Sequence, residues 1–277
     1  MMTAHPFIQA AAMASLSVLL AACCDEPQTT DGDTTGPDTT LISTQVEDTM
    51  AFPFCENTQT RLHPGQYPAV ISPFFPKRTL EVALMPGETP DPLWVFVQEV
   101  AKRWEVIGID LRFDTGERPD IVVSLKQGGL SSAVGFAAFG KSPSMFLGSL
   151  RKKRMARLVR EWAVLHEFGH ALGFQHEFGN PSAGAIPWNK PAVYAYFLKK
   201  GLTRDEVDEQ IFWTYNDGSS NYSAFDPSSV MLYRLPDSLF LQKMNWTPGF
   251  GLSPCDEKFG KCMYSEPIGV LFKPCPC

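Results

Sequence analysis

The sequence predicts an α+β fold: a mixed, twisted sheet with two long helices in the first half, then an irregular half that still contains helices. Three observations support this prediction. Short alternating or apolar runs, typical of strands, surround a long stretch with helical apolar spacing. A second such stretch follows near the middle of the chain. From His176 onward Pro, Asn and Gly are frequent, which favours turns over long regular elements.

Length and composition limit the number of domains and the classes of partner. With 277 residues, 44% of them hydrophobic, and no repeat period, the chain is expected to form one main domain. The formal net charge of -6 argues against a nucleic-acid partner, which would require a basic face to neutralise phosphates. The one basic cluster, Arg151–Arg154, is interpreted as a solvated loop.

Residues 1–22 have the features of a secretory signal peptide. Phe7–Ala22 is almost uninterruptedly apolar and ends in small residues, too short a stretch for a convincing membrane span. The residues Leu20-Ala21-Ala22-Cys23 resemble a bacterial lipobox, so we expect Cys23 to be lipidated and to anchor the exported protein to the cell envelope. The stretch before the apolar run carries no Lys or Arg, and plain secretion is the alternative.

Residues 23–50 are predicted to be a flexible tether. The segment is rich in Thr, Asp, Pro and Gly, as in Thr29–Pro37, and it has almost nothing apolar to bury. The folded domain is therefore assigned to residues 51–277.

The cysteines predict disulfides, because an exported protein keeps its thiols in an oxidising compartment. Cys55 lies near the start of the domain, and four more lie near its end: Cys255, Cys262, Cys275 and Cys277. We interpret them as bridges that join the two ends of the domain, although spacing does not fix the partners. Zinc ligation by cysteines is the alternative, and the absence of paired CxxC spacing argues against it.

The first long helix is predicted from Leu93 to about Ile107, after the opening Pro90-Asp91-Pro92. A core-facing stripe is expected at Val97, Val100, Ala101 and Trp104. Strands are predicted at Arg78–Leu84, Ile109–Phe113, Asp120–Leu125, Ser131–Phe139 and Ser144–Leu147, and the Gly-containing fourth of these fits a sheet edge.

The second long helix is predicted from about Met155 to Leu172. One side of it is expected to be buried through Leu158, Trp162, Leu165 and Phe168. In the irregular half, a helix pair is predicted at Pro191–Lys200 and Thr203–Tyr215.

A metal site is predicted at the end of the second helix. His166 and His170 are four residues apart and project from one helix face, and Glu167 follows the first of them. Gly173 can take the left-handed conformation that ends a helix, so that the chain turns and His176 reaches the same ion. Three neutral imidazoles with an open fourth position are typical of catalytic zinc, so we expect one Zn²⁺ here.

The pattern HExxHxxGxxH, followed by Glu177, resembles that of the astacin family in the metzincin clan of zinc endopeptidases. A second motif supports the resemblance: metzincins carry a methionine turn, and astacins have a tyrosine two residues after that methionine. Here the sequence Ser229-Val230-Met231-Leu232-Tyr233 matches. The resemblance extends over about 78–264 and implies a metzincin-like fold.

The resemblance also implies roles for individual residues. Met231 would form a hydrophobic floor under the ligands, Glu167 would act as general base, and the Tyr233 hydroxyl would stabilise the oxyanion. The segment Ser131–Gly135 resembles the family's edge strand, along which a protein or peptide substrate lies extended.

The sequence departs from the family pattern in two ways, and the partner of Glu177 is open. Leu232 stands where astacins usually have histidine, and no clear activation segment is found, with Asp48 and Cys55 as weak candidates for a group that caps the zinc. In astacins the glutamate after the third histidine pairs with a processed N-terminus. Glu177 would need cleavage beyond the lipid anchor to do so, and local hydrogen bonding is the alternative.

The hypothesis from the sequence is a zinc-dependent endopeptidase, exported and lipid-anchored, with residues 51–277 as its catalytic domain. Two alternatives stay open. One is a catalytically silent, zinc-stabilised binding or adhesion module of the same fold. The other is a structural lipoprotein in which the histidine motif is incidental.

Overall fold

A computed structural model of the chain describes residues 56–57, 74–114, 116–214, 221–266, 268, 275 and 277. The predicted signal peptide at 1–22 and tether at 23–50 lie outside these residues, as do Cys23, Asp48 and Cys55. No helix in the described part is long and apolar enough to cross a membrane.

The predicted mixed sheet is confirmed, and its described strands follow the order β1-β5-β6-β4-β2-β3. Parallel pairs join β2 to β3 and β4, β4 to β6, and β1 to β5, whereas β5 and β6 are antiparallel. The strand bounds are β1 Glu56–Asn57, β2 Thr79–Leu84, β3 Asp110–Phe113, β4 Ile121–Ser124, β5 Ser131–Ser132 and β6 Met145–Phe146.

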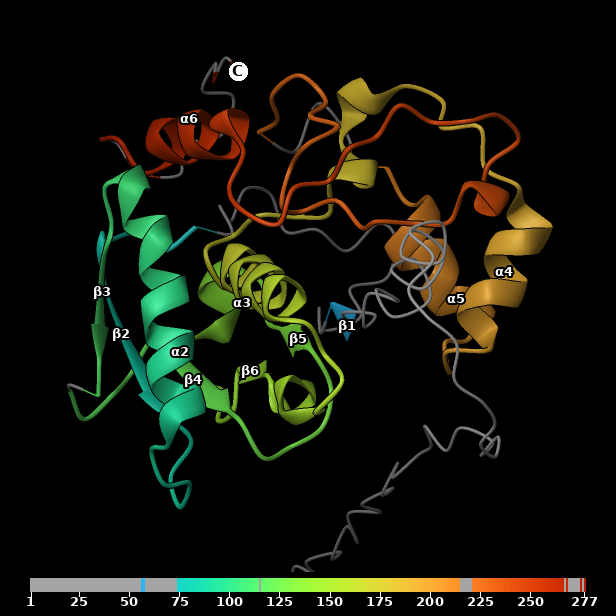
Figure 1. The fold of residues 1–277 in the computed structure, drawn as a ribbon. Coiled ribbons are helices and arrows are strands. Elements are labelled where there is room, and N and C mark those ends of the chain that lie inside the picture. The colour runs from blue at the N-terminus through green and yellow to red at the C-terminus, as the bar shows by residue number, and fades with distance from the viewer. Residues whose placement is uncertain are drawn as a thin grey trace, which may run out of the picture. The chain divides into compact units, whose positions relative to one another are not determined.

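Two long helices pack side by side on one face of this sheet (Figure 1). The first, α2, spans Pro92–Ala101 and continues as a 3₁₀ helix over Lys102–Ile107; Asp91 caps it by accepting from the Leu93 and Trp94 amides. The second, α3, spans Arg157–Ala171. The whole stripe predicted on the first helix is buried. These helices therefore bury the apolar face of the sheet, as the periodicity predicted.

One predicted core position on α3 is wrong. Leu158 is 51% exposed, whereas the next residue, Val159, is 2% exposed. The stripe of Trp162, Leu165 and Phe168 is buried as expected. At the start of α3 the core-facing residue is therefore Val159, one position after the predicted Leu158.

The strand predicted at 131–139 is mostly wrong. Only Ser131–Ser132 pairs in the sheet, and a 3₁₀ helix follows at Gly135–Ala138. Gly135 has a φ of 53°, a left-handed conformation that turns the chain out of an extended path. The segment is also not a free edge, because β1 pairs with β5 on the side away from β6.

The second half is less regular, as predicted, and carries α4 Lys190–Leu198, α5 Arg204–Val207 with a π-helical extension Asp208–Phe212, and α6 Pro254–Met263. The helix pair was predicted from the sequence and α6 was not. Ser253 and Asp256 form a capping box at the start of α6, a signal that the sequence displays as Ser-x-x-Asp.

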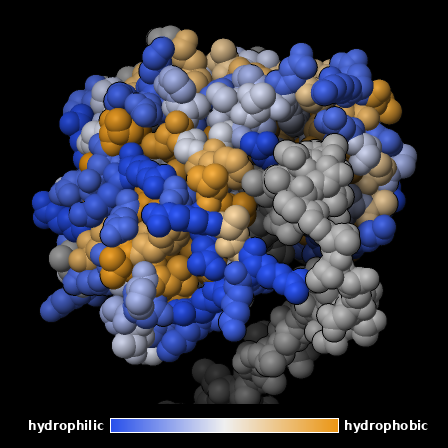
Figure 2. All heavy atoms as spheres, viewed as in Figure 1, coloured by the Kyte–Doolittle hydropathy of each residue, from blue (hydrophilic) through white to orange (hydrophobic). Residues whose placement is uncertain are grey.

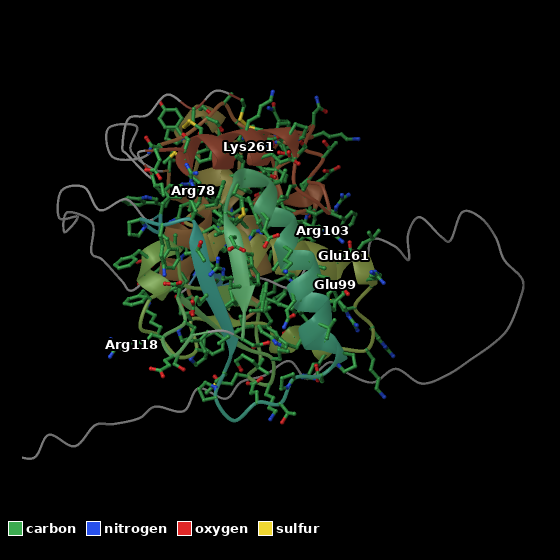
Figure 3. All side chains as sticks on the ribbon, turned by 90° about the vertical axis from the view of Figure 1, so that its left-hand side faces the viewer. Arg78, Glu99, Arg103, Arg118, Glu161 and Lys261 are labelled. Carbon is green, nitrogen blue, oxygen red and sulfur yellow. A yellow bond between two sulfur atoms is a disulfide. The ribbon has the colours of Figure 1, made fainter. Side chains whose placement is uncertain are left out.

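The expectation that disulfides join the two ends of the domain is wrong for the C-terminal cysteines. Cys255 bonds to Cys277, and Cys262 bonds to Cys275. All four pair among themselves, so both bridges close the C-terminal segment onto α6. The start of β2 is tied to the end of α6 by a hydrogen bond: Arg78, labelled in Figure 3, donates from Nε to the Tyr264 carbonyl at 2.8 Å.

The face shown in Figure 2 is largely hydrophilic, with hydrophobic residues visible over α2. Val95 on this helix is 52% exposed. The basic cluster 151–154 is exposed as predicted, and within it Arg151 pairs with Asp91 at 2.7 Å.

Candidate metal centre

Helix α3 delivers three of the predicted site residues. His166, Glu167 and His170 are all buried near its C-terminal end. The helix ends as predicted: Gly173 has a φ of 99°, and the Phe174 amide returns to the Gly169 carbonyl at 2.9 Å. This turn brings His176 back against the helix.

The three histidines converge on one point. The Nε2 atoms of His170 and His176 are 3.1 Å apart, and one nitrogen from each of the three rings lies within 4.8 Å of the others. The Nδ1 of His166 bonds the Val230 carbonyl and the Nδ1 of His170 bonds the Phe174 carbonyl, each at 2.9 Å. A carbonyl only accepts, so each Nδ1 carries the proton and each Nε2 keeps a free lone pair.

The chemistry of this donor set fits a metal ion. Burial lowers the pKa of His170 to about 4, and burial together with the neighbouring histidines holds the pKa values of His166 and His176 well below 6.5. All three rings are therefore neutral at neutral pH, the state in which imidazole binds metals. His166 Nε2 is buried and, among the described residues, has no hydrogen-bond partner. A buried nitrogen of this kind is costly unless a cation takes the lone pair.

The methionine turn lies against α3. A Cβ on Gly169 would fall 2.4 Å from the Met231 sulfur and 3.1 Å from Trp104, so only glycine allows the turn to approach the helix this closely. Met231 is 1% exposed and the Glu177 amide donates to its carbonyl at 3.1 Å. The turn thus lies next to the ligand helix and to the residue after the third histidine.

The Tyr233 hydroxyl points to the same place as the ligand atoms. It lies 2.9 Å from His176 Nε2, and the ring packs against His166, His176 and Phe178. The side chain is 3% exposed. The hydroxyl is therefore within hydrogen-bond distance of one of the three converging imidazoles.

Comparison with solved structures identifies proteins of the same fold. One structure of myroilysin matches with a TM-score of 0.64 and 29% identity, over 72% of this chain and 98% of the myroilysin chain. A second myroilysin structure matches with a TM-score of 0.52 and 26% identity, over 76% of this chain and 90% of that one. The chain has an astacin-like metzincin fold. The match spans nearly the whole of the first myroilysin chain and so includes both halves of the domain.

A structure of high choriolytic enzyme 1, a hatching-enzyme zinc protease from the medaka fish Oryzias latipes, has a TM-score of 0.41 and 16% identity, over 69% of this chain and 90% of that one. A scan against protein-family models and a search of curated proteins found no match.

Leu232 and Glu177, the two residues for which the resemblance left a question, can be placed in this fold. Leu232 is fully buried and packs in the hydrophobic core. Glu177 accepts from Asn180 Nδ2 at 2.9 Å and from the Asp226 amide at 2.8 Å, which is the local hydrogen bonding given above as the alternative. Burial raises its pKa to about 8.

The strand to which the resemblance assigns the substrate already has a neighbour. Glu56 pairs with Ser131 and Asn57 pairs with Ser132, in the parallel direction. A peptide that added to this edge of β5 would have to take the place of β1.

The three predicted histidines thus converge on one point. The groups that hydrogen-bond to their rings were not predicted from the sequence. The carbonyls of Val230 and Phe174 orient two of the rings. Backbone acceptors have no sequence signature. Asp256 accepts from the Val230 amide in the methionine turn, although it lies 26 residues after Val230 in the chain. The one sequence feature that marked Asp256 was the capping box with Ser253.

Proposed function

We propose that the protein is a zinc-dependent endopeptidase that uses His166, His170 and His176 as metal ligands. The convergence of three buried, neutral imidazoles beside Glu167 and the Tyr233 hydroxyl supports this proposal. Three histidine nitrogens leave a coordination position open, which is typical of catalytic rather than structural zinc. When bound, zinc lowers the pKa of water to about 7 and polarises a carbonyl.

The protein residues divide the remaining work. Glu167 is 1% exposed and follows a ligand directly, so its carboxylate can take a proton from the attacking water and pass it to the leaving amine. The Tyr233 hydroxyl would donate to the oxygen on which negative charge develops, a contribution of about 3 kcal/mol for comparable donors. No covalent intermediate with the protein is required.

The substrate would be an extended protein or peptide segment. Pairing with β5 through main-chain hydrogen bonds would tolerate many sequences, because the side chains then contribute little to alignment. The two disulfides fit an oxidising compartment outside the cytoplasm. An anchor through lipidated Cys23 completes the proposal and rests on the lipobox-like sequence.

Metal removal tests the proposal. The purified chain is assayed on an unstructured protein substrate before chelation, after chelation, and after one equivalent of zinc is returned. We expect the substrate to be cleaved before chelation, to stay intact after chelation, and to be cleaved again once zinc is returned. Zinc bound in stoichiometric amount without any cleavage would favour the silent binding module, and absence of bound zinc would favour the structural lipoprotein.

A further inference from the structure

Helix α6 begins with a capping box that contains a buried carboxylate. The Ser253 hydroxyl accepts from the Asp256 amide at 2.9 Å, and Asp256 Oδ2 accepts from the Ser253 amide at 2.8 Å. The Asp256 residue is only 6% exposed. Capping alone does not require burial, because most capping carboxylates remain in contact with water.

The same carboxylate holds the methionine turn. Asp256 Oδ2 also accepts from the Val230 amide at 2.9 Å, and Oδ1 accepts from the Ser229 hydroxyl at 2.7 Å. The Ser229 oxygen in turn accepts from the Met231 amide at 3.0 Å. One side chain on α6 therefore fixes three consecutive residues of the turn, all of them buried.

The turn passes this constraint to the metal centre. The Val230 carbonyl accepts from His166 Nδ1 at 2.9 Å and from Trp162 Nε1 at 3.1 Å. The bond to Nδ1 determines both the tautomer of His166 and the direction in which its Nε2 points. The orientation of Val230 thus depends on Asp256 at its amide and sets His166 through its carbonyl.

We infer that Asp256 is a positioning residue for the metal centre. Through Val230 it aims His166 Nε2 at the metal position, and through Ser229 it holds Met231 against Gly169. Both carboxylate oxygens are needed, since one accepts two backbone amides and the other accepts the Ser229 hydroxyl. The inference rests on the proposed metal ligands and not on peptidase activity.

The test measures zinc affinity in the full-length protein by competition with a chromophoric chelator. Asp256→Ala should weaken zinc binding about 10–100-fold, the usual effect of losing a group that orients a ligand. Asp256→Asn keeps the acceptor for the backbone amides and loses only the acceptor for Ser229, so its loss should be smaller. Cobalt substituted for zinc should show an altered visible spectrum in Asp256→Ala, which reports ligand geometry directly.

Two control variants separate positioning from helix capping. Ser253→Ala removes the hydroxyl that caps α6 and donates to Asp226, but it leaves the contacts of Asp256 to Val230 and Ser229, so the zinc affinity should stay within a few-fold of the parent. Glu257→Gln changes the neighbouring, more exposed carboxylate and should have no effect.

Three outcomes would overturn the inference. Parental zinc affinity and cobalt spectrum in a folded Asp256→Ala would do so, as would equal losses in Ser253→Ala and Asp256→Ala. If Asp256→Ala does not fold, an unchanged spectrum together with unchanged affinity in Asp256→Asn would do the same. A parent protein that binds no zinc would overturn the proposed function as well, and this distinguishes the two failures.

Discussion

Gly169 allows the methionine turn and the ligand helix to meet. The residue lies inside α3, between Glu167 and His170, where glycine lowers helix stability. Its lack of a side chain leaves room for the Met231 sulfur. The sequence motif therefore encodes a packing requirement in addition to the ligands.

Replacing Gly169 with Ala should lower the free energy of unfolding by about 1–3 kcal/mol, the usual cost of overpacking a core. The new methyl group must displace the Met231 side chain, which packs against α3 at this point. Thermal or denaturant unfolding measures the effect. Gly251→Ala is the matched control, because nothing lies within 4 Å of the added Cβ. Equal stability of the two variants would contradict the packing described here.

Among single residues, the sequence predicted which side chains come together at the end of α3. The spacing of the three histidines and Gly173 was sufficient to place them, because helix geometry and turn chemistry are local. Met231 and Tyr233 were placed by the family resemblance, and the structure brings both against this helix end. Asp256 could not be predicted, because its partners lie 26 and 27 residues away in the chain and the pairing depends on the tertiary fold. Leu158 was placed in the core by local periodicity but is exposed. Periodicity alone does not show which part of a helix the neighbouring elements cover.

Among the elements, α3 is connected to the first helical stretch by a charged triad. Glu161 on α3 accepts from Arg157 and from Arg103, each at 2.9 Å, and the last pair is visible in Figure 3. The hydrogen bond from Arg157, and next that from Arg103, lower the pKa of Glu161 although burial raises it. The carboxylate is therefore more stable ionised in the folded protein than in the unfolded chain.

Glu161→Gln should lower stability at neutral pH by up to about 1 kcal/mol, a small value because both arginines are largely exposed to solvent. A group whose folded pKa is lowered stabilises above its unfolded pKa, here 4.5, and that contribution is lost as pH falls below it. Unfolding measured from pH 7 to pH 3 should show the two proteins converging. Glu99→Gln, a change at an exposed carboxylate of α2, is the control. A difference that stays constant with pH would contradict the triad.

The strand pairing of β1 leads to a second prediction at this scale. If substrates add to β5, the segment Glu56–Asn57 competes with them. Replacing both residues with Pro removes their amide donors and should raise peptide hydrolysis a few-fold, given about 1 kcal/mol for a backbone hydrogen bond. The same double change at Thr34 and Thr35 in the predicted tether is the control. Unchanged hydrolysis in the first variant would show that β1 does not limit access.

The whole molecule combines a regular half that the sequence predicted in most of its elements with an irregular half that it predicted only in outline. Periodicity predicted β2, β3, β4, β6 and the two long helices, whereas it missed β1 and extended β5 too far. The order of the strands in the sheet is a property of the complete fold. The disulfides were predicted to join the two ends of the domain, and this was wrong because cysteine spacing does not specify partners. Both bridges instead close on α6, the helix that carries Asp256. The two bridges and the carboxylate that holds the turn at Ser229–Met231 are thus on the same helix.

The central claim is that a bound zinc ion and Glu167 together hydrolyse peptide bonds. The most direct measurement compares the zinc content and the peptide hydrolysis rate of the parent protein with those of Glu167→Gln. We predict one zinc in each, with hydrolysis in the variant reduced about 10²–10⁴-fold, as expected for loss of a general base. A variant that keeps its zinc and hydrolyses peptides at the parental rate would contradict the claim.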